Sequence, residues 1–236
     1  MKILAIVPAR CGSKGFLHKN IAKIGDKTLL ELAVNVGLSC DVVDDVYIST
    51  DCVEYEQIAL KAGAKSLGLR PEYLATDTAK SIDAIIDVLE KIDVMYDYVI
   101  LLQPTSPLRR PDDIKNMIQK IIENDSDASV SVVQLDEPHP YKLKSIDKEG
   151  YITPFIDGAI SEIPRQLLPK VYALNGALYI TKVSVILKDK TFLPKHTIPY
   201  IMDKLINIDT EEDFIFMETM LKSRKIKLFG VTNGND

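Results

Sequence analysis

The regular alternation of short β-branched runs with longer amphipathic runs constrains the fold of this chain most strongly. Such alternation is typical of strands joined by crossover helices in a largely parallel sheet, with ligands bound at the carboxyl ends of the strands. Strands are predicted over residues 2–7, 45–49, 98–102, 128–133 and 176–180, and helices over residues 28–38, 53–62, 81–92, 114–122 and about 211–221.

The length predicts one α/β domain, residues 1–236, because single domains of this class commonly reach about 250 residues. The alternation stops over about 137–172, where several prolines break any long element. That segment is too apolar and aromatic for a disordered linker. We therefore expect it to pack either on its own sheet or on a second subunit.

The composition indicates a soluble protein that acts on small molecules. A formal net charge of -5 argues against a nucleic-acid-binding surface, which needs a basic excess. Cys11, Cys40 and Cys52 have neither the pairing of a disulfide framework nor the spacing of a zinc site. No apolar run approaches the roughly 20 residues of a membrane span, and no signal-peptide flank is present. We expect a cytoplasmic protein with no membrane partner.

The segment after the first predicted strand has the residues of a phosphate-binding loop. It runs from Pro8 to Gly15 and is followed by Lys19 and Asn20. Its glycines let backbone N–H groups face an anion, and Arg10, Lys14 and Lys19 supply positive charge. The loop lacks the ending of a P-loop and the glycine spacing of a dinucleotide site. A solvated surface turn is the alternative, but the position at a strand's carboxyl end favours phosphate binding.

Five blocks in register give the sequence a specific resemblance that covers nearly the whole chain. The blocks are Ala9–Gly15 with Lys19 and Asn20, Arg70–Ala79, Leu101–Arg109, Asn175–Ile180 and Ile208–Asp213. Together they resemble the CMP-sialic acid synthetases, also called acylneuraminate cytidylyltransferases. The resemblance implies an α/β, Rossmann-like nucleotidyltransferase sheet with helices on both faces. It also implies an extended dimerisation arm at about 137–172 and a homodimer.

The resemblance implies transfer of CMP from CTP to the anomeric hydroxyl of an acidic, nine-carbon 2-keto sugar, with release of pyrophosphate. It assigns catalytic roles to Arg10, Lys19 and Asp209. It assigns CTP binding to eight further residues, namely Ala9, Gly12, Ser13, Lys14, Gly15, Asn20, Arg70 and Ser81. Arg70 and Ser81 would face the cytosine. The alternatives are a surface ion pair for Arg70 and a helix cap for Ser81.

The same resemblance implies a metal ion and a sugar pocket. Mg²⁺, or Mn²⁺, would be held by the triphosphate and Asp209, with Asn207 as a second candidate ligand in place of the aspartate of many relatives. The sugar-binding residues would be Gln103, Lys142, Arg165, Asn175, Tyr179 and Phe192. In the family the arm reaches across a dimer, so Lys142 and Arg165 would serve the partner's site. Tyr179 and Phe192 have core packing as their alternative.

Other functions remain open at this point. The sugar could instead be legionaminic, pseudaminic or 3-deoxy-octulosonic acid, because Ala173 and Leu174 stand where sialic acid members often have Arg-Pro. A nucleotide-sugar glycosyltransferase would need Asp125 and Asp127 to bind metal, although a solvated turn explains them better. Asp213 is expected to serve the helix macrodipole rather than a metal. Asn207 also leaves room for a catalytically silent scaffold.

Overall fold

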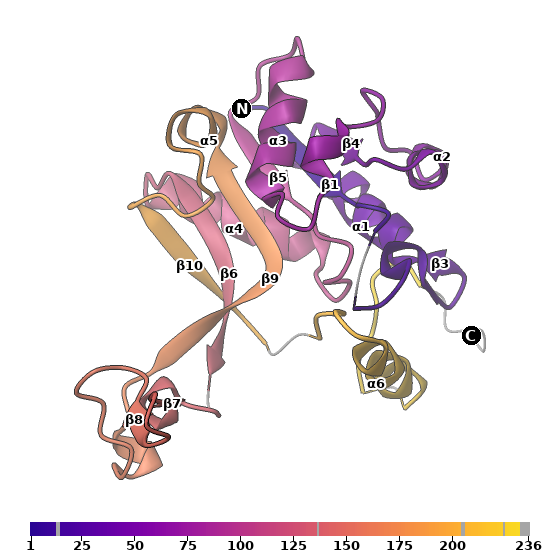
Figure 1. Cartoon of the computed structure of the whole chain (residues 1–236). Helices are drawn as coiled ribbons and strands as arrows, with labels where there is room; N and C mark the ends of the chain where they lie inside the picture. Colours follow the sequence, from indigo (N-terminus) through magenta and orange to yellow (C-terminus); the bar gives the residue numbers. More distant parts are fainter. Residues whose placement is uncertain (13–14, 136, 204–205, 224, 232–236) are drawn as a thin grey trace.

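The computed structural model describes residues 1–12, 15–135, 137–203, 206–223 and 225–231. Within these residues a six-stranded sheet has the order β10-β6-β9-β5-β1-β4 (Figure 1). Its strands are β1 (Ile3–Pro8), β4 (Asp45–Ser49), β5 (Tyr98–Leu101), β6 (Ala128–Leu135), β9 (Val171–Lys182) and β10 (Thr197–Met202). The helices are α1 (Leu29–Leu38), α2 (Val53–Lys61), α3 (Ser81–Lys91), α4 (Pro111–Glu123), α5 (Val183–Asp189) and α6 (Glu211–Lys222).

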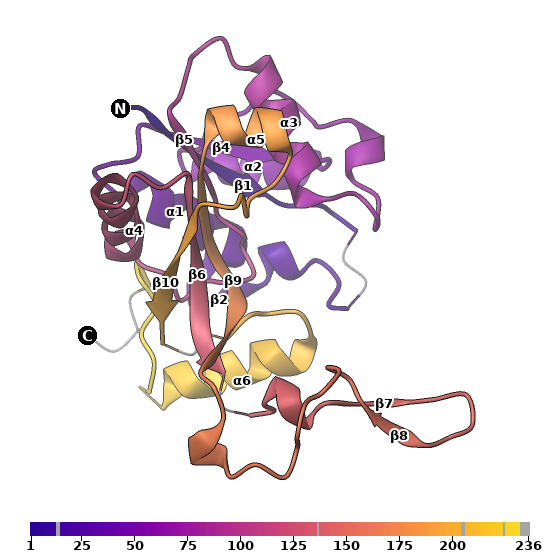
Figure 2. The same ribbon diagram turned by 90° about the vertical axis from the view of Figure 1, so that its left-hand side faces the viewer.

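Strand β1 lies at the centre of the core, with helices on both faces of the sheet (Figure 2). Because successive side chains of a strand point to opposite faces, Ala5 and Val7 pack with α1, α2 and α4. Leu4 and Ile6 pack on the other face, with α3 and α5. All four side chains are fully buried. The expected Rossmann-like α/β fold is therefore confirmed.

The sheet is mixed rather than purely parallel. Strand β1 pairs in parallel with β4 and β5, and β10 pairs in parallel with β6. Strand β9 is antiparallel to both β5 and β6, and it is longer than predicted at both ends. The sequence prediction omitted β10 and α5. Strand β10 contains Pro199 at the edge of the sheet, where the missing N–H is tolerated.

The β6–β9 ladder is interrupted beside the carboxyl end of β5. Val130 pairs with Tyr179, whereas Val132 pairs with Leu174, so residues 175–178 of β9 lie outside the ladder. Gly176 has a φ of 72° in this interruption, a left-handed conformation that glycine adopts without a steric penalty. The irregularity bends β9 between the arm and the residues that pair with β5.

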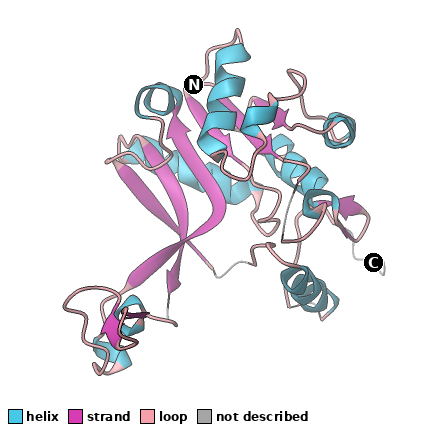
Figure 3. Ribbon diagram, in the orientation of Figure 1, coloured by secondary structure: helices cyan, strands magenta, loops and turns pink. Residues whose placement is uncertain are grey.

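The segment over about 137–170 projects from the sheet on the stem of β6 and β9 (Figure 1). It consists mostly of loop, with a small hairpin of β7 (Lys144–Ile146) and β8 (Ile152–Pro154) (Figure 3). We call it the arm. Its side chains include Ile146, Tyr151, Ile152 and Phe155, which are 66–76% exposed. The sequence predicted that the arm packs either on its own sheet or on a second subunit. These four side chains do not pack on their own sheet.

A second small sheet lies beside the loop that follows β1. It is formed by β2 (Lys23–Ile24) and β3 (Lys27–Thr28), which are antiparallel and lead directly into α1. Thr28 caps α1 through a capping box with Glu31, so the helix begins one residue later than predicted. No helix of the described ranges has both the length and the apolarity to cross a bilayer.

Candidate active site

A cavity of about 730 Å³ opens at the carboxyl ends of β1 and β5, where the sequence placed the phosphate loop. Its walls come from the loops after these strands, the start of α3 and the segment before α6. Nine of the residues that line the cavity were predicted to bind or act on the substrates. They are Arg10, Gly15, Lys19, Asn20, Arg70, Ser81, Gln103, Asn207 and Asp209.

The loop after β1 is held by contacts to neighbouring segments. Ala9 is buried and its N–H donates to the Ser49 carbonyl at 3.0 Å, so it extends the sheet rather than lining the cavity. Asn20 is also buried, and its amide donates to the Arg10 carbonyl at 3.1 Å. These bonds fix the loop on which the Arg10 side chain stands.

The glycines of this loop differ in what they do. A Cβ on Gly15 would lie 2.8 Å from the Asp209 carbonyl oxygen, so the close approach of the two segments requires glycine there. Gly12 has open space around the same position and does not line the cavity. The predicted Ser13 and Lys14 lie outside the described residues.

Lys19 and Asp209 join the two sides of the cavity. Lys19 Nζ lies 2.9 Å from Asp209 Oδ1 and 3.2 Å from the Ile208 carbonyl oxygen. Asn207 Nδ2 donates to Asp209 Oδ2 at 2.7 Å, while Asn207 Oδ1 accepts from the Ser106 hydroxyl at 2.8 Å. A carboxylate can only accept hydrogen bonds, so the NH₂ group of the Asn207 amide must face Asp209 and its oxygen must face Ser106. The Asp209 carboxylate is therefore oriented from both sides.

Asp213 has the structural role expected of it. Its carboxylate accepts from the backbone N–H groups of Thr210 and Asp209, which lowers the pKa of Asp213. Thr210 completes a capping box at the start of α6. Asp213 therefore serves the helix terminus and orients the backbone of Asp209.

The surroundings of Arg70 and Ser81 contradict both structural alternatives. Arg70 is 8% exposed, lies 3.6 Å from Asp51 Oδ1, and has its pKa lowered by burial, so it is not a solvated surface arginine. Ser81 is the first residue of α3, and the N-cap is Lys80, so Ser81 is not the cap. Both residues line the cavity.

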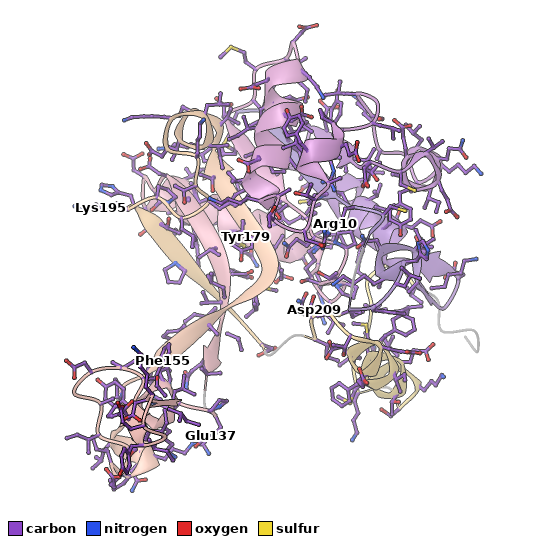
Figure 4. The ribbon with its side chains drawn as sticks, viewed as in Figure 1. Arg10, Glu137, Phe155, Tyr179, Lys195 and Asp209 are labelled. Atoms are coloured by element: carbon purple, nitrogen blue, oxygen red, sulfur yellow. The ribbon has the colours of Figure 1, made fainter. Side chains whose placement is uncertain are left out.

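The sugar-binding predictions are divided between the cavity and the arm. Gln103 lines the cavity directly after β5. Lys142 and Arg165 lie in the arm, which Figure 4 shows well away from Arg10 and Asp209. Lys142 pairs with Glu137 at 3.2 Å, and Arg165 lines a separate hollow of about 370 Å³ beside His139. Within one chain, these two cations do not reach the cavity.

Three other predicted sugar-binding residues lie outside the cavity lining. Tyr179 and Phe192 pack together with ring centroids 5.6 Å apart, against the core cluster that contains Ile186. Burial raises the pKa of Tyr179. Asn175 accepts from the Ser131 hydroxyl at 2.6 Å and from the Ala177 N–H. The core-packing alternative therefore describes Tyr179 and Phe192 in the single chain.

Several cavity residues had no predicted role, although most lie inside the blocks that carried the resemblance. Asp77 pairs with Arg10 at 2.7 Å, and Lys80 adds another cation to the lining. Asp127, in contrast, pairs with Lys182 at 3.1 Å and does not line the cavity. No group of three or more His, Cys, Asp or Glu residues suited to a metal occurs in the described ranges.

The comparisons with known proteins agree with this geometry. The profile of a cytidylyltransferase family matches residues 4–229. A CMP-N,N'-diacetyllegionaminic acid synthase of Legionella pneumophila is 34% identical over 94% of this chain and 97% of its own length. An N-acylneuraminate cytidylyltransferase of Streptococcus agalactiae is 33% identical over 97% of this chain, which spans 57% of that protein.

A solved structure of a CMP:2-keto-3-deoxy-manno-octonic acid synthetase complexed with CTP superposes with a TM-score of 0.71. It is 17% identical, covers 95% of this chain and is itself covered completely, which shows a shared fold. The family profile and the two sequence relatives together identify the chain as a nucleotidyltransferase of the cytidylyltransferase family, in the branch of the CMP-sialic acid synthetases.

Proposed function

We propose that this enzyme transfers CMP from CTP to the anomeric hydroxyl of a sialic-acid-like, nine-carbon 2-keto acid sugar and releases pyrophosphate. The observation that carries the proposal is the cavity bounded by Arg10, Lys19 and Asp209 at the carboxyl edge of the sheet. The names of the relatives support CTP-dependent cytidylyl transfer to an acidic sugar. The reaction joins the sugar oxygen to the α-phosphorus of CTP. It breaks the bond between that phosphorus and the oxygen that leaves with pyrophosphate.

The protein would act mainly by positioning and by electrostatic stabilisation. Arg10 and Lys19 would face the phosphates, where their charge offsets the negative charge that builds during transfer. In the free enzyme these cations are paired with Asp77 and Asp209. Both ion pairs are partly exposed and therefore weak. They hold the cations in place, and phosphate oxygens could replace the carboxylates at little cost in free energy.

The cytosine would bind at the side of the cavity formed by Arg70 and Ser81. Arg70 is anchored by Asp51, which also accepts from the Cys11 backbone N–H at 3.0 Å. Asp51 therefore connects the base end of the cavity to the phosphate loop. This arrangement would keep the distance between base and phosphate contacts constant.

Mg²⁺ or Mn²⁺ would be shared between the triphosphate and the protein. The residues fit this arrangement, because Asp209 offers one carboxylate, 63% exposed, beside the phosphate-facing Lys19. Mg²⁺ keeps several waters and is often bound through one or two carboxylates and substrate phosphates. The ion would neutralise phosphate charge. Asn207 is hydrogen-bonded to both Asp209 and Ser106. We therefore propose that it orients Asp209 rather than binding the metal itself.

The sugar would bind at the Gln103 side of the cavity, and its carboxylate requires a cation. We propose that Lys142 and Arg165 of the partner subunit's arm supply it in a homodimer. The exposed apolar side chains of the arm support this arrangement, because a second subunit would remove them from water. Asn175, Tyr179 and Phe192 lie outside the cavity lining in the single chain, so their contact with the sugar would depend on this assembly.

Two other candidates differ in how the cavity would be used. Legionaminic, pseudaminic and 3-deoxy-octulosonic acids share the 2-keto acid group, and relatives named for several of these sugars resemble this chain. A glycosyltransferase would need Asp125 and Asp127 at the cavity, but Asp127 is engaged by Lys182 outside it. Of these two candidates, only cytidylyl transfer to another acid sugar is therefore supported.

A pyrophosphate-release assay tests the proposal most simply. The purified chain is incubated with CTP, Mg²⁺ and, in separate reactions, each of the four acid sugars. We expect release that depends on both substrates, strongest with a nine-carbon sugar, and lost in Asp209→Ala. Release with 3-deoxy-octulosonic acid alone would change the assigned sugar. Absence of release with every sugar would refute cytidylyl transfer.

A further inference from the structure

Arg109 is the largest fully buried side chain of the described residues, with no exposed surface. Burial lowers its pKa to about 9, and no ion pair with a carboxylate of the described ranges offsets the burial. Its Nε and Nη2 atoms have no hydrogen-bond partner in this part of the structure. Burying a cation without a counter-charge is costly, so a role beyond filling space is needed to explain it.

The bonds that Arg109 does make join two segments at the edge of the cavity. Nη1 donates to the Gln103 carbonyl at 2.6 Å and to the Ala177 carbonyl at 3.2 Å. Gln103 follows β5, and Ala177 lies in the interrupted part of β9. The β5–β9 ladder ends where Leu101 pairs with Tyr179. Arg109 therefore connects the two strands immediately beyond their last paired residues.

Side chains of the loop after β5 also pack against the backbone of Gly176. A Cβ on Gly176 would lie 3.3 Å from Gln103 Oε1 and 3.6 Å from the Ser106 hydroxyl. The Gln103 amide thus packs against the Gly176 turn, and its position depends on how closely β9 approaches the loop after β5. Gln103 lines the cavity, whereas Arg109 does not.

From these contacts we infer that Arg109 is a positioning residue, which sets the Gln103 amide at the sugar end of the cavity by clamping the loop after β5 to the bend of β9. The inference rests on the proposed function, in which Gln103 contacts the sugar. The guanidinium suits this task because its Nη1 carries two N–H donors in a rigid plane, one for each of the two carbonyls. The cytosine and phosphate contacts, on Arg70, Ser81 and Lys19, come from other segments.

The test compares Arg109→Met, Arg109→Lys and the control Arg110→Met in the full chain. Arg110 is the exposed neighbour of Arg109 and does not line the cavity. Initial rates of pyrophosphate release give separate KM values for CTP and for the sugar. We expect Arg109→Met to raise the sugar KM about tenfold or more, because small misplacements of a contact are costly. The CTP KM should stay within about twofold, and Arg110→Met should match the wild type.

The split between the two KM values distinguishes positioning from general stability. A general loss of stability would raise both values or lower only the amount of active enzyme. Arg109→Lys keeps the charge and a donor, so we expect partial rescue of the sugar KM. Unchanged kinetics in Arg109→Met, or equal increases for CTP and sugar, would overturn the inference.

If Arg109→Met does not fold, Arg109→Lys decides by the same split: a raised sugar KM with an unchanged CTP KM supports positioning, and any other result overturns it. Failure of the proposed function would be recognised separately. In that case the wild type and Arg110→Met would also release no pyrophosphate.

Discussion

Lys19 Nζ and Asp209 Oδ1 lie 2.9 Å apart, although 190 positions separate these residues in the chain. The contact joins the loop after β1 to the segment before α6 across the mouth of the cavity. It places the cation proposed to face phosphate oxygens beside the carboxylate proposed to share a divalent ion. Two segments far apart in the sequence thus meet at one site.

Replacing Lys19 by Ala should reduce kcat/KM by about 10²–10³-fold, because a preorganised charge is lost where phosphate charge develops. The fold should survive, since a partly exposed ion pair contributes about 1 kcal/mol or less. Pyrophosphate release and thermal unfolding measure the two effects. Lys23→Ala, at an exposed position in β2, is the matched control. Wild-type turnover in a folded Lys19→Ala variant would refute a role for Lys19 in cytidylyl transfer.

Gly176→Ala should destabilise the protein and raise the sugar KM. Its φ of 72° disfavours an L-residue, and the new Cβ would press against the Gln103 amide. We expect a loss of about 1–3 kcal/mol in the free energy of unfolding, measured by denaturant titration. Gly68→Ala is the control, because Gly68 has a φ of 85° with open space around it. An equal effect of both variants on the sugar KM would contradict the contact with Gln103.

A heterodimer tests whether the arm serves the partner's site. Lys19→Ala and Lys142→Ala chains are co-expressed with different tags, and the mixed dimer is purified. If Lys142 acts across the interface, one complete site is restored, and kcat per dimer should reach about half the wild-type value. Each homodimer of a single variant serves as the inactive reference. A mixed dimer as inactive as both references would contradict a role for Lys142 in the partner's site.

The Cys11 thiol should react slowly with an alkylating reagent near neutral pH. A hydrogen bond with Cys52 and burial raise the pKa of Cys11 to about 11. Because the thiolate is the nucleophile, its alkylation by iodoacetamide should rise about tenfold per pH unit between pH 8 and 10. Peptide mass mapping measures the rate at Cys11, with free cysteine as the reference. A rate that levels off near pH 9 would show an ordinary thiol.

The sequence predicts the central strands well for a physical reason. Strand β1 is buried on both faces, so its apolar run is continuous and leaves little ambiguity. Strand β10 is less clear, because edge strands tolerate proline and Pro199 interrupts the pattern. The first half of β9 forms the exposed stem of the arm, where Tyr172 and Leu174 are about half exposed and periodicity is weak.

Some residues of the candidate site can be predicted from the sequence, and others cannot. Charged residues in the loop after a strand, such as Arg10 and Lys19, can be recognised from their type and position. Arg109 cannot, because a buried arginine and an exposed one look alike in a sequence, and the difference depends on how β5 and β9 pack. The predicted helix start at Ser81 is confirmed, and the capping alternative for Ser81 was wrong because the cap position belongs to the preceding residue, Lys80.

A crystal structure of the enzyme with CTP and Mg²⁺ is the most direct test of the central claim. We expect phosphate oxygens about 3 Å from Arg10 and Lys19, with the cytosine against Arg70 and Ser81. CTP bound outside the cavity between the loop after β1 and Asp209, with that cavity empty, would contradict the account.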